Sequence, residues 1–171
     1  LIEQHKLYIN RFNHFVTFND FYTLTAPTLT EPVIDFSPIV NALRLINLSN
    51  IYLASTGEAS DAIDNLLLRH KQLRELLMQQ DTLIGKLFLL NLISENIDLT
   101  YLLARKNHVI ITRNISLLTA KERSFTAAFS RELRMMNHMF QSLDRSPDIF
   151  SHSGQEAQFT SPAWLTRMLY K

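Results

Sequence analysis

The feature that most constrains this 171-residue chain is residues 81–105, a segment that is apolar around most of a helical circumference. At about 100° per residue its aliphatic and aromatic side chains point in nearly all directions. The polar side chains that gather together are Asn91, Ser94, Glu95 and Asp98. A helix this apolar must pack against other parts of the protein on several sides. We therefore expect residues 81–105 to be the central helix of a bundle, with Leu87, Phe88 and Ile97 buried.

The same segment is long enough to cross a membrane. It carries Lys86, Glu95 and Asp98, however, and charges near the centre of a bilayer are costly. The helical-bundle interpretation is therefore favoured over a membrane span.

The rest of the chain also has helical periodicity, and its 3 Gly and 5 Pro are few. Helix starts are predicted from Ser37-Pro38, from capping-box spacings at Ser55–Glu58 and Thr119–Glu122, and from Asp81. Helices are expected at 1–24, 38–54, 58–80, 81–105 and 120–143, with a last one from Ser161. These patterns predict one all-α domain over residues 1–171, an irregular bundle of five to six helices, with an extended Pro/Thr segment at 24–37.

The two ends of the sequence suggest a fragment of a longer chain. It begins at Leu1 without a methionine and ends in an apolar helical pattern with no stop signal. Zero cysteines exclude disulfides and weakly favour an oxidising compartment. We expect a periplasmic, extracytoplasmic domain of a larger, membrane-anchored protein, touching a membrane only through a missing flanking segment.

No stretch has the spacing of a phosphate loop, a nucleophile elbow or a zinc-binding helix. No catalytic residue, metal ligand or cofactor is therefore assigned. His70 alone among the six histidines falls on an apolar helical face, and we expect it to be a neutral, hydrogen-bonded core residue.

The carboxylates of residues 81–105 offer the strongest polar candidate. Asn91, Glu95 and Asp98 share one face, and Arg44 is their expected counter-ion. The structural interpretation is a buried charge network, because buried acids need partners. The functional alternative is a small-ligand site or an enzyme that uses this stripe.

Two further surfaces are candidates for interactions. Aromatic residues crowd residues 1–24, and we expect an interface at Phe12, Phe15, Phe18 and Tyr22. Residues 120–143 are strongly amphipathic, with Phe129, Leu133, Met136 and Phe140 expected to face inward. Their basic residues, Arg123, Arg131 and Arg134, could form a cationic surface.

The favoured function is a non-catalytic protein–protein interaction or scaffold module, whose partner is another protein or a second copy of the chain. The ligand-binding or enzymatic alternative uses the polar stripe. A third possibility is a helical nucleic-acid-binding domain, but a net charge of +1 gives no specific nucleic-acid signal.

Overall fold

The computed structural model describes residues 6–18, 23–28, 31, 34–112 and 115–145. Within these ranges the chain forms helices and no strand, which confirms the all-α helical bundle. The helices are α1 (Lys6–Phe15), α2 (Ser37–Ser55), α3 (Ala59–Gln79), α4 (Leu83–Lys106), α5 (Ala120–Arg123) and α6 (Thr126–Arg145). The predicted interface residue Tyr22 and the predicted last helix lie outside the described residues.

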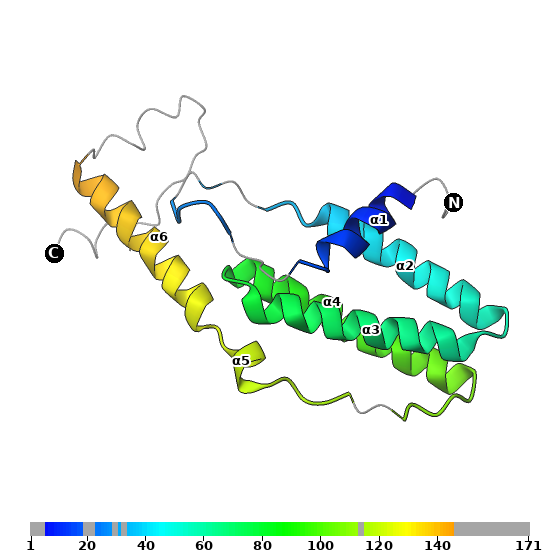
Figure 1. The fold of residues 1–171 in the computed structure, drawn as a ribbon. Coiled ribbons are helices and arrows are strands. Elements are labelled where there is room, and N and C mark those ends of the chain that lie inside the picture. Colours follow the sequence, from blue (N-terminus) through cyan, green and yellow to red (C-terminus); the bar gives the residue numbers. More distant parts are fainter. Residues whose placement is uncertain (1–5, 19–22, 29–30, 32–33, 113–114, 146–171) are drawn as a thin grey trace, which may run out of the picture.

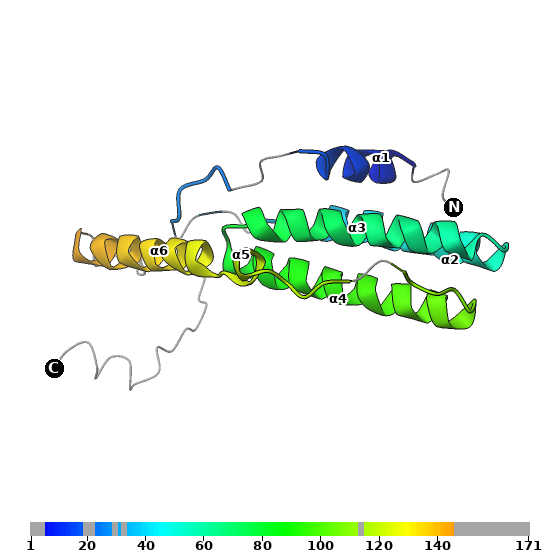
Figure 2. The same ribbon diagram turned by 60° about the horizontal axis from the view of Figure 1, so that its bottom comes forward.

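The three long helices α2, α3 and α4 run side by side in alternating directions and form the body of the bundle (Figures 1 and 2). The short helix α1 lies against α2 and, through Phe12 and Arg69, against α3. An extended segment leads from α4 to α5, and α6 then projects away from one end of the bundle (Figure 1). The helix α6 is therefore an arm attached to a compact body.

The core consists of two apolar clusters along α3. One cluster joins α1, α2, α3 and α4 through residues such as Phe12, Leu43, Leu77 and Leu89. The other joins α2, α3 and α4 around Leu66, with small residues allowing close helix approach, namely Ala54, Ala59, Ala62 and Ala104. Because α3 packs on α2, α4 and α5, it shares the centre of the bundle with α4.

The helix α4 is a core element, but it is not covered all round. Its buried side chains follow helical spacing through Leu89, Leu92, Asn96, Thr100 and Leu103. The expected burial of Leu87 is wrong, since 54% of its surface is exposed. Phe88 and Ile97 are half-buried, and the Phe88 ring stacks on Phe36 with centroids 4.3 Å apart. Both faces of α4 are rich in apolar residues, so composition alone could not tell the covered face from the exposed one.

Two predicted helix starts differ from the structure by a residue or more. The N-terminal cap of α4 is Thr82, whose hydroxyl accepts a hydrogen bond from Gly85 N, rather than Asp81. The side chain of Ser37 does not cap α2, because Ser37 is already the first helical residue. Its N–H donates to the Asp35 carboxylate at 2.9 Å.

The turn between α2 and α3 closes without the predicted capping box. Glu58 precedes α3 with no side-chain cap, and the Ser55 hydroxyl donates back to Tyr52 O at 2.7 Å. Gly57 provides the turn instead, at φ 100°, a left-handed conformation that favours glycine. Glu58 N then donates to Leu53 O at 3.1 Å, which is typical of a helix C-terminus ending in glycine.

The predicted helix 120–143 is interrupted, and the predicted helix 1–24 is shorter than expected. Thr119 does form the predicted capping box with Glu122. However, the chain extends at Ser124 and separates α5 from α6. At the N-terminus, α1 ends at Phe15. The described part of 24–37 before Ser37 is non-helical, as predicted.

Candidate functional site

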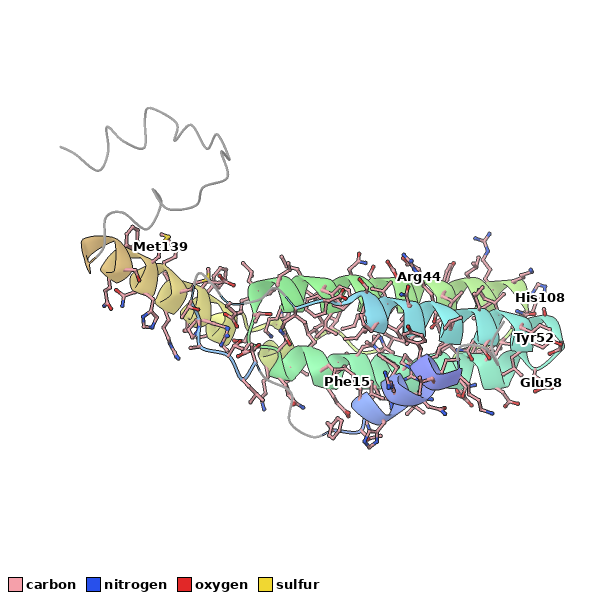
Figure 3. The ribbon with its side chains drawn as sticks, turned by 90° about the horizontal axis from the view of Figure 1, so that it is seen from above. Phe15, Arg44, Tyr52, Glu58, His108 and Met139 are labelled. Carbon is pink, nitrogen blue, oxygen red and sulfur yellow. The ribbon has the colours of Figure 1, made fainter. Side chains whose placement is uncertain are left out.

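The polar stripe expected on α4 lies on the outside of the bundle. Asn91, Glu95 and Asp98 are all exposed, and Asn91 Nδ2 donates to Glu95 Oε1 at 2.8 Å. Arg44 is also exposed, on the outer side of α2 (Figure 3). The expected buried charge network is therefore wrong, and burial gives these side chains no special chemistry. Ligand binding by the stripe stays a prediction.

A groove of about 540 Å³ lies between α3 and the segment that leads into α5. Its lining combines apolar and charged side chains, chiefly Leu67, Leu68, His70, Arg74, Ile115 and Glu122. None of the stripe residues belongs to it. The chemistry of this groove depends on which of its polar atoms are free.

Arg74 and Glu122 are not free, because they bind each other at two points. Arg74 Nε donates to Glu122 Oε1 at 2.6 Å, and Nη2 donates to Oε2 at 2.7 Å. The remaining guanidinium N–H groups donate hydrogen bonds to the carbonyl oxygens of Ser116 and Leu117. Glu122 Oε2 also accepts from Thr119 N as part of the capping box. Together these contacts join α5 and the preceding segment to α3.

The ion pair strongly favours the ionised carboxylate. Hydrogen bonds from Arg74 are the main cause that lowers the pKa of Glu122 to about 2, against desolvation, which raises it. The same pairing raises the pKa of Arg74. This arrangement is typical of a structural joint, because a general acid or base would need a pKa near neutrality.

His70 is the most unusual group beside the groove. Only 7% of its surface is exposed, and neither ring nitrogen has a hydrogen-bond partner among the described residues. Desolvation lowers its pKa, the charge of Arg74 lowers it further, and the charge of Glu122 raises it. The predicted core location is confirmed, whereas the expected hydrogen bond is not seen. Both nitrogens are inaccessible, so a molecule in the groove would meet ring carbons rather than a base.

Lys86 is a buried charge that the sequence did not single out as functional. Its side chain is only 2% exposed, its Nζ donates to Leu77 O at 3.0 Å, and it lies 5.6 Å from the centroid of Phe125. Desolvation lowers the pKa of Lys86. Because the carbonyl belongs to the last turns of α3, the cation lies at the negative end of that helix dipole. The signal available in the sequence was a lysine within an otherwise apolar turn of the helix.

The aromatic N-terminal segment contributes to the core of its own bundle. Phe12 is 4% exposed and packs beneath Arg69, whose guanidinium carbon lies 4.8 Å from the ring centroid. Arg69 Nη2 donates to Asn13 Oδ1 at 2.9 Å, and desolvation lowers the pKa of Arg69 to about 10. Phe15 is half-buried and Phe18 exposed. Phe12 is therefore unavailable to a partner, and the expected interface loses one of its four residues.

The expected cationic surface is divided by the structure. Arg123 and Arg134 are exposed, whereas Arg131 is mostly buried in contacts with the N-terminal half of the chain. Its Nη2 donates to the Glu31 carboxylate and, at 2.7 Å, to Thr25 O, and its Nη1 lies 3.5 Å from Asp81 Oδ2. Asp81 also accepts from Thr23 N and from the Thr23 hydroxyl. Arg131 therefore anchors α6 instead of contributing to an open basic patch.

The main surface feature of α6 is a line of exposed apolar side chains, which we name the α6 strip. It consists of Phe129, Leu133, Met136 and Phe140, each 46 to 65% exposed. The expectation that these residues face inward is wrong. The covered side of α6 is instead the side of Ala128, which is fully buried, and Arg131.

Comparisons with protein-family models, curated proteins and solved structures find no match to this chain. Among the residues that the structure describes, no three His, Asp or Glu side chains are grouped as a metal site would require. By length and composition α4 alone of the described helices could cross a membrane, but core helices satisfy the same criteria, and nine of its residues are buried. The α6 strip is thus the feature of the described surface that most needs a functional explanation.

Proposed function

We propose that this domain is a non-catalytic protein–protein interaction module that engages its partner through the α6 strip. The observation that carries the proposal is the exposure of four large apolar side chains along one line of a helix that projects from the bundle (Figure 1). Contiguous apolar patches larger than roughly a few hundred Å² are uncommon on the surface of a monomer and often mark interfaces.

The spacing of the strip favours a helical partner. Phe129, Leu133, Met136 and Phe140 are separated by four, three and four residues, which is the spacing of the seam in a coiled coil. A seam this narrow suits one helix packed alongside another, whereas a membrane-surface helix usually presents a wider apolar face.

The ligand-binding alternative has less support. The stripe of Asn91, Glu95 and Asp98 is open to solvent, and Arg74 and Glu122 in the groove are paired with each other. An extracytoplasmic location and a membrane anchor outside this sequence accompany the interaction proposal as further predictions.

Site-specific photo-crosslinking in cells that express the protein would test the proposal. A photoreactive amino acid at Leu133 should form adducts with protein, and the same probe at Leu102, a leucine of α4 that is 58% exposed, should form few. Absence of adducts at Leu133, or equal yields at the two positions, would contradict the proposed interface.

A further inference from the structure

We propose that the partner of the α6 strip is a second copy of this chain, with the two α6 helices antiparallel across a twofold axis. This inference rests on the proposed function, because it concerns the same surface. It adds the identity, the orientation and the register of the partner helix.

The order of side chains along the strip is self-complementary. The spacing of four, three and four residues reads the same in both directions, and the residues at its two ends, Phe129 and Phe140, are both phenylalanine. An antiparallel pair centred between Arg134 and Met135 would place Phe129 against Phe140 of the partner subunit. Leu133 would then pack against Met136 of the partner subunit. A twofold interface requires this property, since the same patch serves both subunits.

The residues flanking the strip allow such a pair. In this register Ser130 approaches Asn137 of the partner subunit, and Glu132 approaches Met139 of the partner subunit, so no two like charges meet. Arg134 and His138 lie on the polar side of α6, away from the strip. Pairing therefore brings no like charges together at these positions.

The position of α6 selects the antiparallel orientation. The helix begins next to the bundle and projects outward (Figures 1 and 2). In an antiparallel pair the two bundles lie at opposite ends of the paired helices, whereas a parallel pair would bring them side by side. The contacts of Arg131 with Glu31 and Asp81 hold α6 in this orientation before a partner arrives.

The size of the strip implies a weak dimer. Pairing would remove on the order of 100 Å² of accessible surface from each of the four half-exposed side chains, or roughly 400 Å² per subunit. A standard interface buries about 800 Å² per partner. We therefore expect a dimer that dissociates in the micromolar range.

Engineered disulfides would test the orientation and register, because the chain has no cysteine of its own. Purified full chains bearing Leu133→Cys and Met136→Cys would be mixed and mildly oxidised. An antiparallel pair predicts mainly the mixed disulfide, identified by mass spectrometry. Dominant Leu133→Cys or Met136→Cys homodisulfides would contradict the antiparallel pair, and no cross-linking above a Leu102→Cys control would contradict the dimer.

Sedimentation would test the dimer without cysteines. At about 200 µM the unmodified chain should be mainly dimeric, and at about 1 µM it should be monomeric. Leu133→Glu should abolish the dimer while keeping the helical circular dichroism, and Leu102→Glu should leave the dimer unchanged. A monomer at high concentration, or equal effects of the two variants, would overturn the inference.

The outcomes separate this inference from the proposed function. If the purified chain is monomeric and a photoreactive group at Leu133 captures a different protein in cells, the second copy is rejected and the interaction surface stands. If Leu133→Cys resists thiol reagents in the monomer, the strip is covered by the chain itself. In that case both proposals fail.

Discussion

Arg74 on α3 and Glu122 on α5 hold each other through two hydrogen bonds, 2.6 Å from Nε to Oε1 and 2.7 Å from Nη2 to Oε2. The two residues are 48 positions apart in the sequence, and Glu122 also forms the capping box of α5 with Thr119. The ion pair therefore joins α5 and the segment before it to α3.

The first prediction concerns the stability that this ion pair contributes. The pKa of Glu122 is lowered from 4.5 to about 2 in the folded chain. The unfolded state therefore binds the proton more readily, so the contribution is present above about pH 4.5 and is lost as the pH falls toward 2. Its full size is about 3 kcal/mol by linkage. At pH 7, Glu122→Gln should lower the free energy of unfolding, measured in urea, by about that amount. Near pH 2 the same substitution should change this free energy little.

Glu75→Gln is the matched control for this measurement. Glu75 pairs with Lys71 at 3.9 Å on the exposed side of α3, and such pairs contribute about 0 to 1 kcal/mol. Equal losses in Glu75→Gln and Glu122→Gln would show that the Arg74–Glu122 pair is exposed and weak.

The second prediction separates two arginines of α6 that have similar sequence contexts. Arg131→Ala removes the hydrogen bonds to the Glu31 carboxylate and to Thr25 O. Hydrogen bonds that involve a charged group contribute about 1.5 to 3 kcal/mol to stability, so the variant should be less stable by about that amount. Hydrogen exchange in α6 should accelerate accordingly. Arg134→Ala, an exposed position, should change stability by less than about 0.5 kcal/mol. Similar exchange rates in both variants would contradict the anchoring role of Arg131.

The third prediction compares two leucines. Leu77 is fully buried where α3 meets α4, and Leu87 is mostly exposed. Leu77→Ala should cost about 2 to 5 kcal/mol, because it leaves a cavity in the core. Leu87→Ala should cost less than about 1 kcal/mol. Urea unfolding of both variants checks the assignment. A larger loss of stability in Leu87→Ala than in Leu77→Ala would contradict the assignment of Leu87 to the exposed face of α4.

Helical periodicity predicted much of the bundle because it reports local properties. The lengths of α2, α3 and α4 follow from apolar residues at helical spacing, and the Thr119 capping box is a four-residue signal. The phase of α4 was less predictable, because Leu87 and Leu89 are the same residue type on different faces. One is exposed and the other is buried, and only the position of α3 decides between them.

The candidate site was less predictable because its determinants are long-range. Amphipathicity shows that α6 has an apolar face, but not whether another element covers that face, as Phe129 and Leu133 demonstrate. The partners of Arg131 lie 100 residues away at Glu31 and 50 residues away at Asp81. Nothing in the local sequence identifies them.

The fourth prediction concerns His70, whose buried imidazole should stay neutral at pH 7. Desolvation and then the charge of Arg74 lower its pKa below 6.5, and the charge of Glu122 opposes them. The unfolded state therefore binds the proton more readily, so protonation destabilises the fold as the pH falls below about 6.5. An NMR titration of the ring should give a pKa below 6.5. Glu122→Gln should lower that pKa further, and Arg74→Lys, which keeps the charge, should move it less. A pKa at or above 6.5, or a rise in Glu122→Gln, would show that the imidazole has an acidic partner other than Glu122.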